Sequence, residues 1–358
     1  MKMKEKLVQV KQCPWCKSEL RESNDIFSNK INHYIIAVLG VTSENAEEII
    51  KTMKGYQCLL CKTTYLDPWF HPDTIAHFFN NQKSVHRAGW GKFRDLVIKG
   101  FSIPETQKTL EILRLLQTEF RGVKRYVEVG CPFMGILGFL SFKESDESVG
   151  KKYLSTKREF FASNYYARKF VRLSNLNNRV EDFFYLRLMY LNTLKFRFRN
   201  FRTIPNPSEF MDLAEIHLPK SIELIVTSPI TNLMWNENCV GETGTCVSTS
   251  ISTFGIGKMK WEDLCSSPDT RETTFVAFFN TLDHQINGAD KIGDALKFAK
   301  YVLVETHTNQ KVEKQHSFVI DDTIKCLDPT RYKVRNLSLE SKKLQSLSID
   351  NYYLITLV

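Results

Sequence analysis

The chain reads Tyr126-Val-Glu-Val-Gly-Cys-Pro-Phe-Met-Gly135 a third of the way along its length. A short apolar segment runs into an acid at Glu128 and then into a glycine, and an apolar helix is expected over residues 136–142. Gly130 permits a sharp turn after a strand, and Gly135 permits a ligand to come close at the head of the next helix. The order strand, glycine turn, helix therefore predicts an α/β sheet with a nucleotide pocket at this turn.

Further apolar segments extend this sheet toward the C-terminus. Helical spacing of leucines over residues 106–120 predicts a helix that leads into the first strand. A second strand is predicted at 222–227, and it ends in Thr227. More strands are predicted at 275–284, 300–305, 331–339 and 352–358, with a helix at 289–298.

The composition is that of a soluble globular protein. The 358 residues are 42% hydrophobic and 25% charged, and this length predicts two domains or one enlarged domain. No apolar run reaches the ~20 residues that a membrane span needs, and no apolar core follows the charged N-terminus as in a secretory signal. The net charge of +9 fits either a solvated basic surface or attraction to a phosphate-bearing partner. A cytoplasmic location is expected.

Two Cys-x-x-Cys pairs indicate a metal site near the N-terminus. The pairs are Cys13 with Cys16 and Cys58 with Cys61. Each pair places two thiolates on one tight turn, and two such turns complete a tetrahedral shell of four sulfurs. Structural zinc is the predicted ion, with iron as an alternative. The chain has nine cysteines, an odd count that fits one metal site in a reducing compartment better than a disulfide framework.

These features divide the chain into three parts. We predict a zinc-binding module at 1–92, a connecting helical segment at 93–122 and the α/β domain at 123–358. An insertion at 151–220 interrupts that domain and is rich in Phe, Tyr and Arg. The insertion is interpreted as helices whose aromatic side chains pack as core, and the alternative is a surface for a substrate or another subunit.

The 126–135 stretch resembles the first motif of class I S-adenosylmethionine-dependent methyltransferases. The segment Asn280-Thr-Leu-Asp-His284 resembles the end of the fourth strand of that family. The family resemblance implies a Rossmann-like seven-stranded methyltransferase sheet. A four-cysteine module joined to such a sheet is similar to the zinc-containing sugar methyltransferases. The residues that this resemblance places at the S-adenosylmethionine cofactor are Glu128, Gly130, Pro132, Gly135, Thr227 and Asn280.

Methyl transfer needs a base that takes the proton of the acceptor. His284 follows the predicted fourth strand at the carboxyl edge, where open α/β sheets bind ligands, and its imidazole titrates near neutrality. We predict that His284 is the base and that Asp283 orients it. His307 and His316, which follow the next strand, are the alternatives.

Three classes of function stay open. The first is methylation of a small molecule, with a sugar or polysaccharide precursor as the acceptor. The second is methylation of nucleic acid, gripped by the zinc module and the basic insertion; the absence of an Asn-Pro-Pro-aromatic motif after the fourth strand argues against part of this class. The third is a non-catalytic relative, because Pro132 replaces the second motif glycine and Thr227 stands where the second strand normally ends in an acid.

Overall fold

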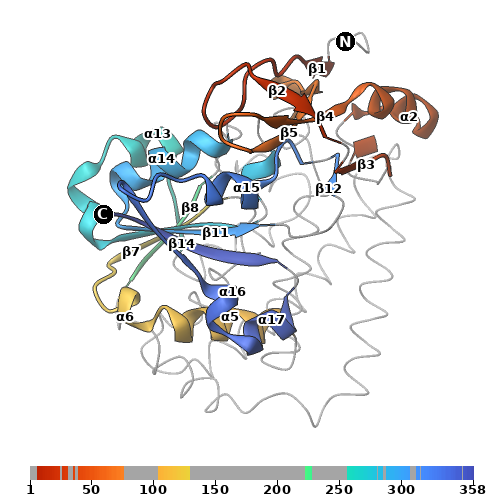
Figure 1. The fold of residues 1–358 in the computed structure, drawn as a ribbon. Coiled ribbons are helices and arrows are strands. Elements are labelled where there is room, and N and C mark those ends of the chain that lie inside the picture. Colours follow the sequence, from red (N-terminus) through yellow and green to blue (C-terminus); the bar gives the residue numbers. More distant parts are fainter. Residues whose placement is uncertain are drawn as a thin grey trace, which may run out of the picture.

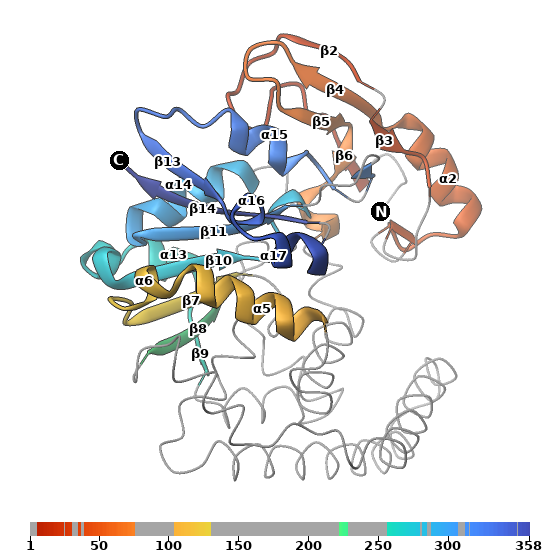
Figure 2. The ribbon, with the colours of Figure 1, turned by 60° about the horizontal axis from the view of Figure 1, so that its bottom comes forward.

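The structure is a computed structural model that describes most of the N-terminal region and of the sheet. The described residues are 6–24, 26–30, 35–36, 39–75, 104–129, 222–227, 256–279, 281–284, 288–306, 312–314, 316–348 and 350–358. They form a mixed α/β architecture with a smaller N-terminal module beside the main sheet (Figure 1, and turned by 60° in Figure 2). The predicted α/β class is confirmed.

Within the described residues, the main sheet has seven strands in the order β13-β14-β11-β10-β7-β8-β9. Five neighbouring strands, from β11 to β9, run parallel to one another. At one edge β14 runs antiparallel to β11, and β13 runs antiparallel to β14. The bounds are β7 (Arg125–Val129), β8 (Glu223–Thr227), β9 (Ile256–Lys258), β10 (Thr274–Phe278), β11 (Tyr301–Thr306), β13 (Tyr332–Asn336) and β14 (Asn351–Leu357).

Helices cover both faces of this sheet, which explains why its central strands are apolar without alternation. Figure 1 shows α13 and α14 on one face and α5, α6, α16 and α17 on the other. Phe275 of β10 stacks on Phe120 of α6 at 4.7 Å between ring centroids. Trp261 of α13 contacts Phe278 of the same strand. The helices are α5 (Pro104–Leu115), α6 (Gln117–Phe120), α13 (Trp261–Cys265), α14 (Gly288–Phe298), α16 (Leu337–Glu340) and α17 (Lys342–Leu347).

In its described residues, the N-terminal module includes two small sheets and the helix α2. Its sheets have the orders β2-β4-β5 and β1-β6. The Thr42 hydroxyl accepts a hydrogen bond from the Asn45 amide and caps α2. The elements are β1 (Leu7–Val8), β2 (Arg21–Ser23), β3 (Phe27–Ser28), α2 (Ser43–Thr52), β4 (Lys54–Cys58), β5 (Thr64–Asp67) and β6 (Trp69–Phe70).

Three predicted elements have other bounds in the structure. The strand predicted at 275–284 ends at Phe278, and a 3-10 turn, η5 (Leu282–His284), follows it. The helix predicted at 106–120 is broken at Leu116, whose backbone leaves the helical region. The strand predicted at 331–339 stops at Asn336, whose side chain accepts hydrogen bonds from two amides and caps α16. In the third case a local polar contact ends the strand, and an apolar pattern does not register such a contact.

Several predictions concern residues that the structure does not describe. The insertion at 151–220 and the helix at 136–142 lie outside the described residues. The boundaries at 92 and 122 therefore stay predictions. Within the described part of the chain, no helix is long and apolar enough to cross a membrane.

Candidate functional site

The four predicted cysteines form one cluster in the N-terminal module. The Sγ atoms of Cys13 and Cys61 lie 3.5 Å apart, and so do those of Cys16 and Cys58. All four sulfurs lie within 4.8 Å of one another. A tetrahedral shell with zinc–sulfur bonds of ~2.3 Å needs sulfurs roughly 3.8 Å apart. The predicted cluster is confirmed, and its geometry fits a structural zinc ion.

The two Cys-x-x-Cys turns have the same backbone geometry. In each turn the fourth residue after the first cysteine has a left-handed backbone, at Lys17 and Lys62, both with φ 60°. That residue donates its amide to the carbonyl of the first cysteine, at 3.1 Å for Lys17 and 2.9 Å for Lys62. The repeated turn aims two sulfurs from each side at one point, as a closed metal site requires.

Burial and hydrogen bonds give the thiols of Cys16 and Cys58 different pKa values. Burial raises the pKa of Cys16 to about 11. The pKa of Cys58 is lowered to about 7. Burial alone would raise this pKa, but hydrogen bonds from the Cys61 amide and from Cys16 outweigh the effect of burial. Since metal ligands must be thiolates, zinc binding here displaces protons and weakens as the pH falls.

The N-terminal module is fastened to the main sheet through the segment that precedes α15 (Ile320–Lys325). The Leu66 amide donates to the Ser317 carbonyl at 2.9 Å, and the Val319 amide donates to the Thr64 carbonyl at 2.8 Å. Thr64 and Leu66 belong to β5, which lies beside α15 in Figure 1. A short strand, β12 (Val312–Glu313), also pairs with β3. The N-terminal module therefore holds the backbone that carries His316.

A second cluster of metal-ligating or acid–base groups lies at this junction. It consists of Asp283, His284 and His316, which are only 2%, 9% and 5% exposed. The Nδ1 atom of His316 lies 2.7 Å from Oδ2 of Asp283. The rings of His284 and His316 are 4.9 Å apart between centroids. We call these three residues the edge cluster.

The edge cluster lies at the carboxyl end of the parallel strands. From β7 the chain proceeds to β8 and β9 on one side, and then returns to β10 on the other side. Ligands of open α/β sheets bind at such a reversal. The Thr281 hydroxyl, just before η5, donates to the Val129 carbonyl at the end of β7, at 3.0 Å. This bond ties the edge cluster to the β7–β10 crevice.

Two of the predicted cofactor residues border the same crevice. Glu128 of β7 is buried, and its carboxylate accepts a hydrogen bond from the Tyr126 hydroxyl at 2.9 Å. Thr227, the last residue of β8, is in register with Val129. The Thr227 hydroxyl is fully buried and has no hydrogen-bond partner among the described residues. The other predicted cofactor residues, Gly130, Pro132, Gly135 and Asn280, lie outside the described part of the chain, as does His307.

The structure brings a further histidine to Asp283. The sequence predicts that Asp283 orients His284, which stays a prediction, and the structure places Nδ1 of His316 2.7 Å from the Asp283 carboxylate. His316 was named only as an alternative, because nothing in its local sequence ties it to Asp283. The Ser317 amide and hydroxyl both donate to the Asp283 carbonyl, at 2.5 and 2.9 Å. This contact between distant segments brings His316 next to Asp283.

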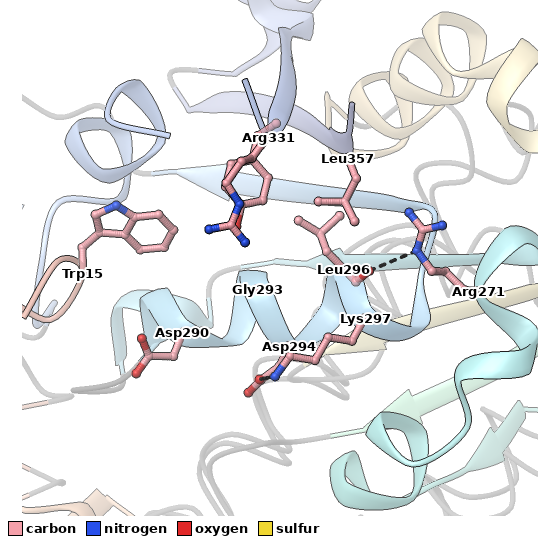
Figure 3. Close-up of a pocket in the computed structure, with 10 residues that line it drawn as sticks. Trp15, Arg271, Asp290, Gly293, Asp294, Leu296, Lys297, Arg331 and Leu357 are labelled. Carbon is pink, nitrogen blue, oxygen red and sulfur yellow. Dashed lines mark hydrogen bonds and ion pairs between the residues drawn. The ribbon is translucent and has the colours of Figure 1, made fainter. Parts of the chain in front are cut away.

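A separate groove of about 670 Å³ runs along α14. Figure 3 shows Trp15 of the first knuckle at one end and Arg271 at the other. Its acids are already paired: Asp290 with Lys17 at 2.8 Å, and Asp294 with Lys297 at 2.9 Å. No residue of the edge cluster lines this groove.

Replacing Gly288 by alanine is expected to disturb the edge cluster. A Cβ atom at this first residue of α14 would lie 1.9 Å from the Leu282 carbonyl oxygen, so η5 would have to move. We expect a loss of about 1–3 kcal/mol in the free energy of unfolding, the usual cost of overpacking. Gly293, in the same helix, has open space around a Cβ atom and is the control. Equal melting curves for G288A and G293A would contradict this assignment.

Comparisons with known proteins do not assign the chain to a family. No family model matches the chain, and no curated protein matches it. The functional conclusions therefore rest on the four-cysteine cluster, the strand order and the edge cluster.

Proposed function

We propose that this protein transfers a methyl group from S-adenosylmethionine to a hydroxyl of a small, sugar-like acceptor, and that a structural zinc ion holds its N-terminal module. The observation that carries the proposal is the reversal of strand order between β7 and β10 with a buried acid–base cluster at that edge. Such a reversal is the usual place for a nucleotide-like ligand.

The ends of β7 and β8 support the cofactor half of the proposal. Glu128 and Thr227 are buried at the ends of neighbouring parallel strands, one residue out of register, so the Glu128 carboxylate and the Thr227 hydroxyl face opposite sides of the sheet. Burial of a hydroxyl without a partner is costly. A ligand atom that bonds to Thr227 would remove that cost, and a ribose hydroxyl of the cofactor suits this position.

The edge cluster supports the transfer half. Methyl transfer from a sulfonium is an in-line displacement, so the protein must align the acceptor and take its proton. Asp283, His284 and His316 supply groups of the right chemistry, and Thr281 ties their segment to the end of β7. The sugar-like acceptor rests on the resemblance to zinc-containing sugar methyltransferases.

Calorimetric titration of the full chain with S-adenosylmethionine tests the proposal. We expect Thr227→Val to weaken binding about 5- to 10-fold, the scale of one neutral hydrogen bond. Thr274→Val is the matched control. Thr274 is also a buried threonine, but it is the first residue of β10 and so lies at the end of the sheet opposite the crevice, where its hydroxyl donates to the Thr270 carbonyl. Absence of binding heat in the wild type at millimolar cofactor would favour the non-catalytic alternative.

The positive charge supports nucleic acid as a second candidate acceptor. The net charge of +9 suits a phosphate-bearing partner. Binding of RNA or DNA that weakens steeply between low and physiological salt would favour this acceptor over a sugar. Salt-independent or absent binding would leave the sugar-like acceptor.

A further inference from the structure

We propose that the edge cluster is a second metal site, in which Asp283, His284 and His316 bind a divalent transition-metal ion. The proposal deepens the proposed function, and it rests on that function only for what the ion would do, not for its binding. Two imidazoles and one carboxylate are a donor set that suits Zn²⁺ and Fe²⁺.

The distances within the cluster suit such an ion after small side-chain movements. Bonds of ~2.1 Å in a tetrahedral shell place ligand atoms roughly 3.4 Å apart. In the edge cluster one ligand atom from each of the three residues lies within 4.8 Å of the other two. Nδ1 of His316 and Oδ2 of Asp283 are 2.7 Å apart. The required ~3.4 Å lies between this distance and the 4.8 Å limit, and rotation about side-chain torsions brings the ligand atoms to it.

Burial and charge also favour an ion. All three side chains are less than a tenth exposed, so a charge here is poorly solvated. A bound divalent ion would balance the Asp283 carboxylate and accept electron pairs from both imidazoles.

The backbone around the cluster is fixed on both sides, as ligands of a metal need. Ser317 bonds twice to the Asp283 carbonyl and accepts from the Leu66 amide. The His284 amide donates to the Thr281 carbonyl at 3.3 Å. The segments that carry the three ligands are therefore joined directly, and β5 of the zinc module clamps one of them.

Three protein ligands leave at least one coordination position for another oxygen, as in catalytic zinc sites. At the β7–β10 crevice that oxygen would be the acceptor hydroxyl, whose O–H bond a Lewis acid weakens. His284 would then act as a ligand, in place of the free base that the sequence predicted.

Metal analysis of the purified full chain tests the site without any knowledge of the acceptor. After saturation with Zn²⁺ and removal of free ions, we expect two zinc ions per chain in the wild type. Asp283→Asn and His316→Ala are expected to hold one. His71→Ala is the matched control, because His71 is half-buried and pairs with an acid, Asp73, outside the cluster; it is expected to keep two.

Cobalt substitution gives a second readout that does not depend on zinc counting. The four-thiolate site gives intense sulfur-to-metal absorption, whereas the edge cluster would add only weak visible bands, which D283N and H316A should lose. One ion per chain in the wild type, with the same cobalt spectrum in wild type and D283N, would overturn the proposal. Titration of the same samples with S-adenosylmethionine separates the two ideas: two ions without cofactor binding would leave the metal site and remove the methyltransferase.

Discussion

Replacement of Cys58 by serine is expected to abolish zinc binding and unfold the N-terminal module. Cys58 supplies one of four sulfurs that lie within 4.8 Å of one another. Structural zinc contributes an apparent ~10–16 kcal/mol to the folding free energy of small metal-dependent folds. This exceeds the stability that a small module has without the ion. Elemental analysis should show the loss of one zinc ion per chain, and limited proteolysis should cut residues before β6 first.

The control for this variant is Cys265→Ser. Cys265 is a half-buried free cysteine of α13, outside the four-cysteine cluster. We expect it to keep the zinc ion and the proteolysis pattern of the wild type. Unchanged metal content in Cys58→Ser would remove the four-cysteine site. Because β5 holds the Ser317 backbone, Cys58→Ser should also loosen the edge cluster, although the cluster lies far along the chain from the cysteines.

Replacement of Lys108 by methionine is expected to destabilise the main sheet by about 3–5 kcal/mol, the cost of leaving a buried charge alone. The Lys108 ammonium lies 3.2 Å from the Glu305 carboxylate at the carboxyl half of β11. The same carboxylate accepts a hydrogen bond from the Tyr352 hydroxyl at 2.5 Å. Burial, together with this carboxylate, raises the pKa of Tyr352. Without Lys108, Glu305 loses the cation that it pairs with among the described residues.

A second substitution separates the charge effect from lost packing. Adding Glu305→Gln to Lys108→Met removes the stranded charge and keeps an acceptor for Tyr352, so most of the lost stability should return. Lys300→Met is the surface control, because the exposed Lys300–Glu272 pair should contribute less than about 1 kcal/mol. Denaturant unfolding measures all three. A double variant no more stable than Lys108→Met alone would contradict the assigned role of the charge.

Features whose geometry is set within a few residues could be predicted. The Cys-x-x-Cys turns place their sulfurs through local hydrogen bonds and one left-handed residue each, so the spacing sufficed. The apolar segments at β7, β8, β10 and β11 are continuous because helices cover both faces of the sheet. The closing pair of β13 and β14 was also predicted, although the first of them is shorter than expected. The three-residue strand β9 was not predicted, since so short a segment carries no period.

The sequence alone determined that this protein has two cysteine knuckles, a buried strand at β7, and a histidine near the end of a buried strand. Only the tertiary structure decided that Asp283 pairs with His316 and that the zinc module holds the partner of that pair. The physical reason is that this partnership depends on hydrogen bonds between β5, η5 and the segment before α15, which are remote in sequence. A local pattern reports which face of a strand is apolar, but the meeting of three distant backbones follows from how the whole sheet and the module pack.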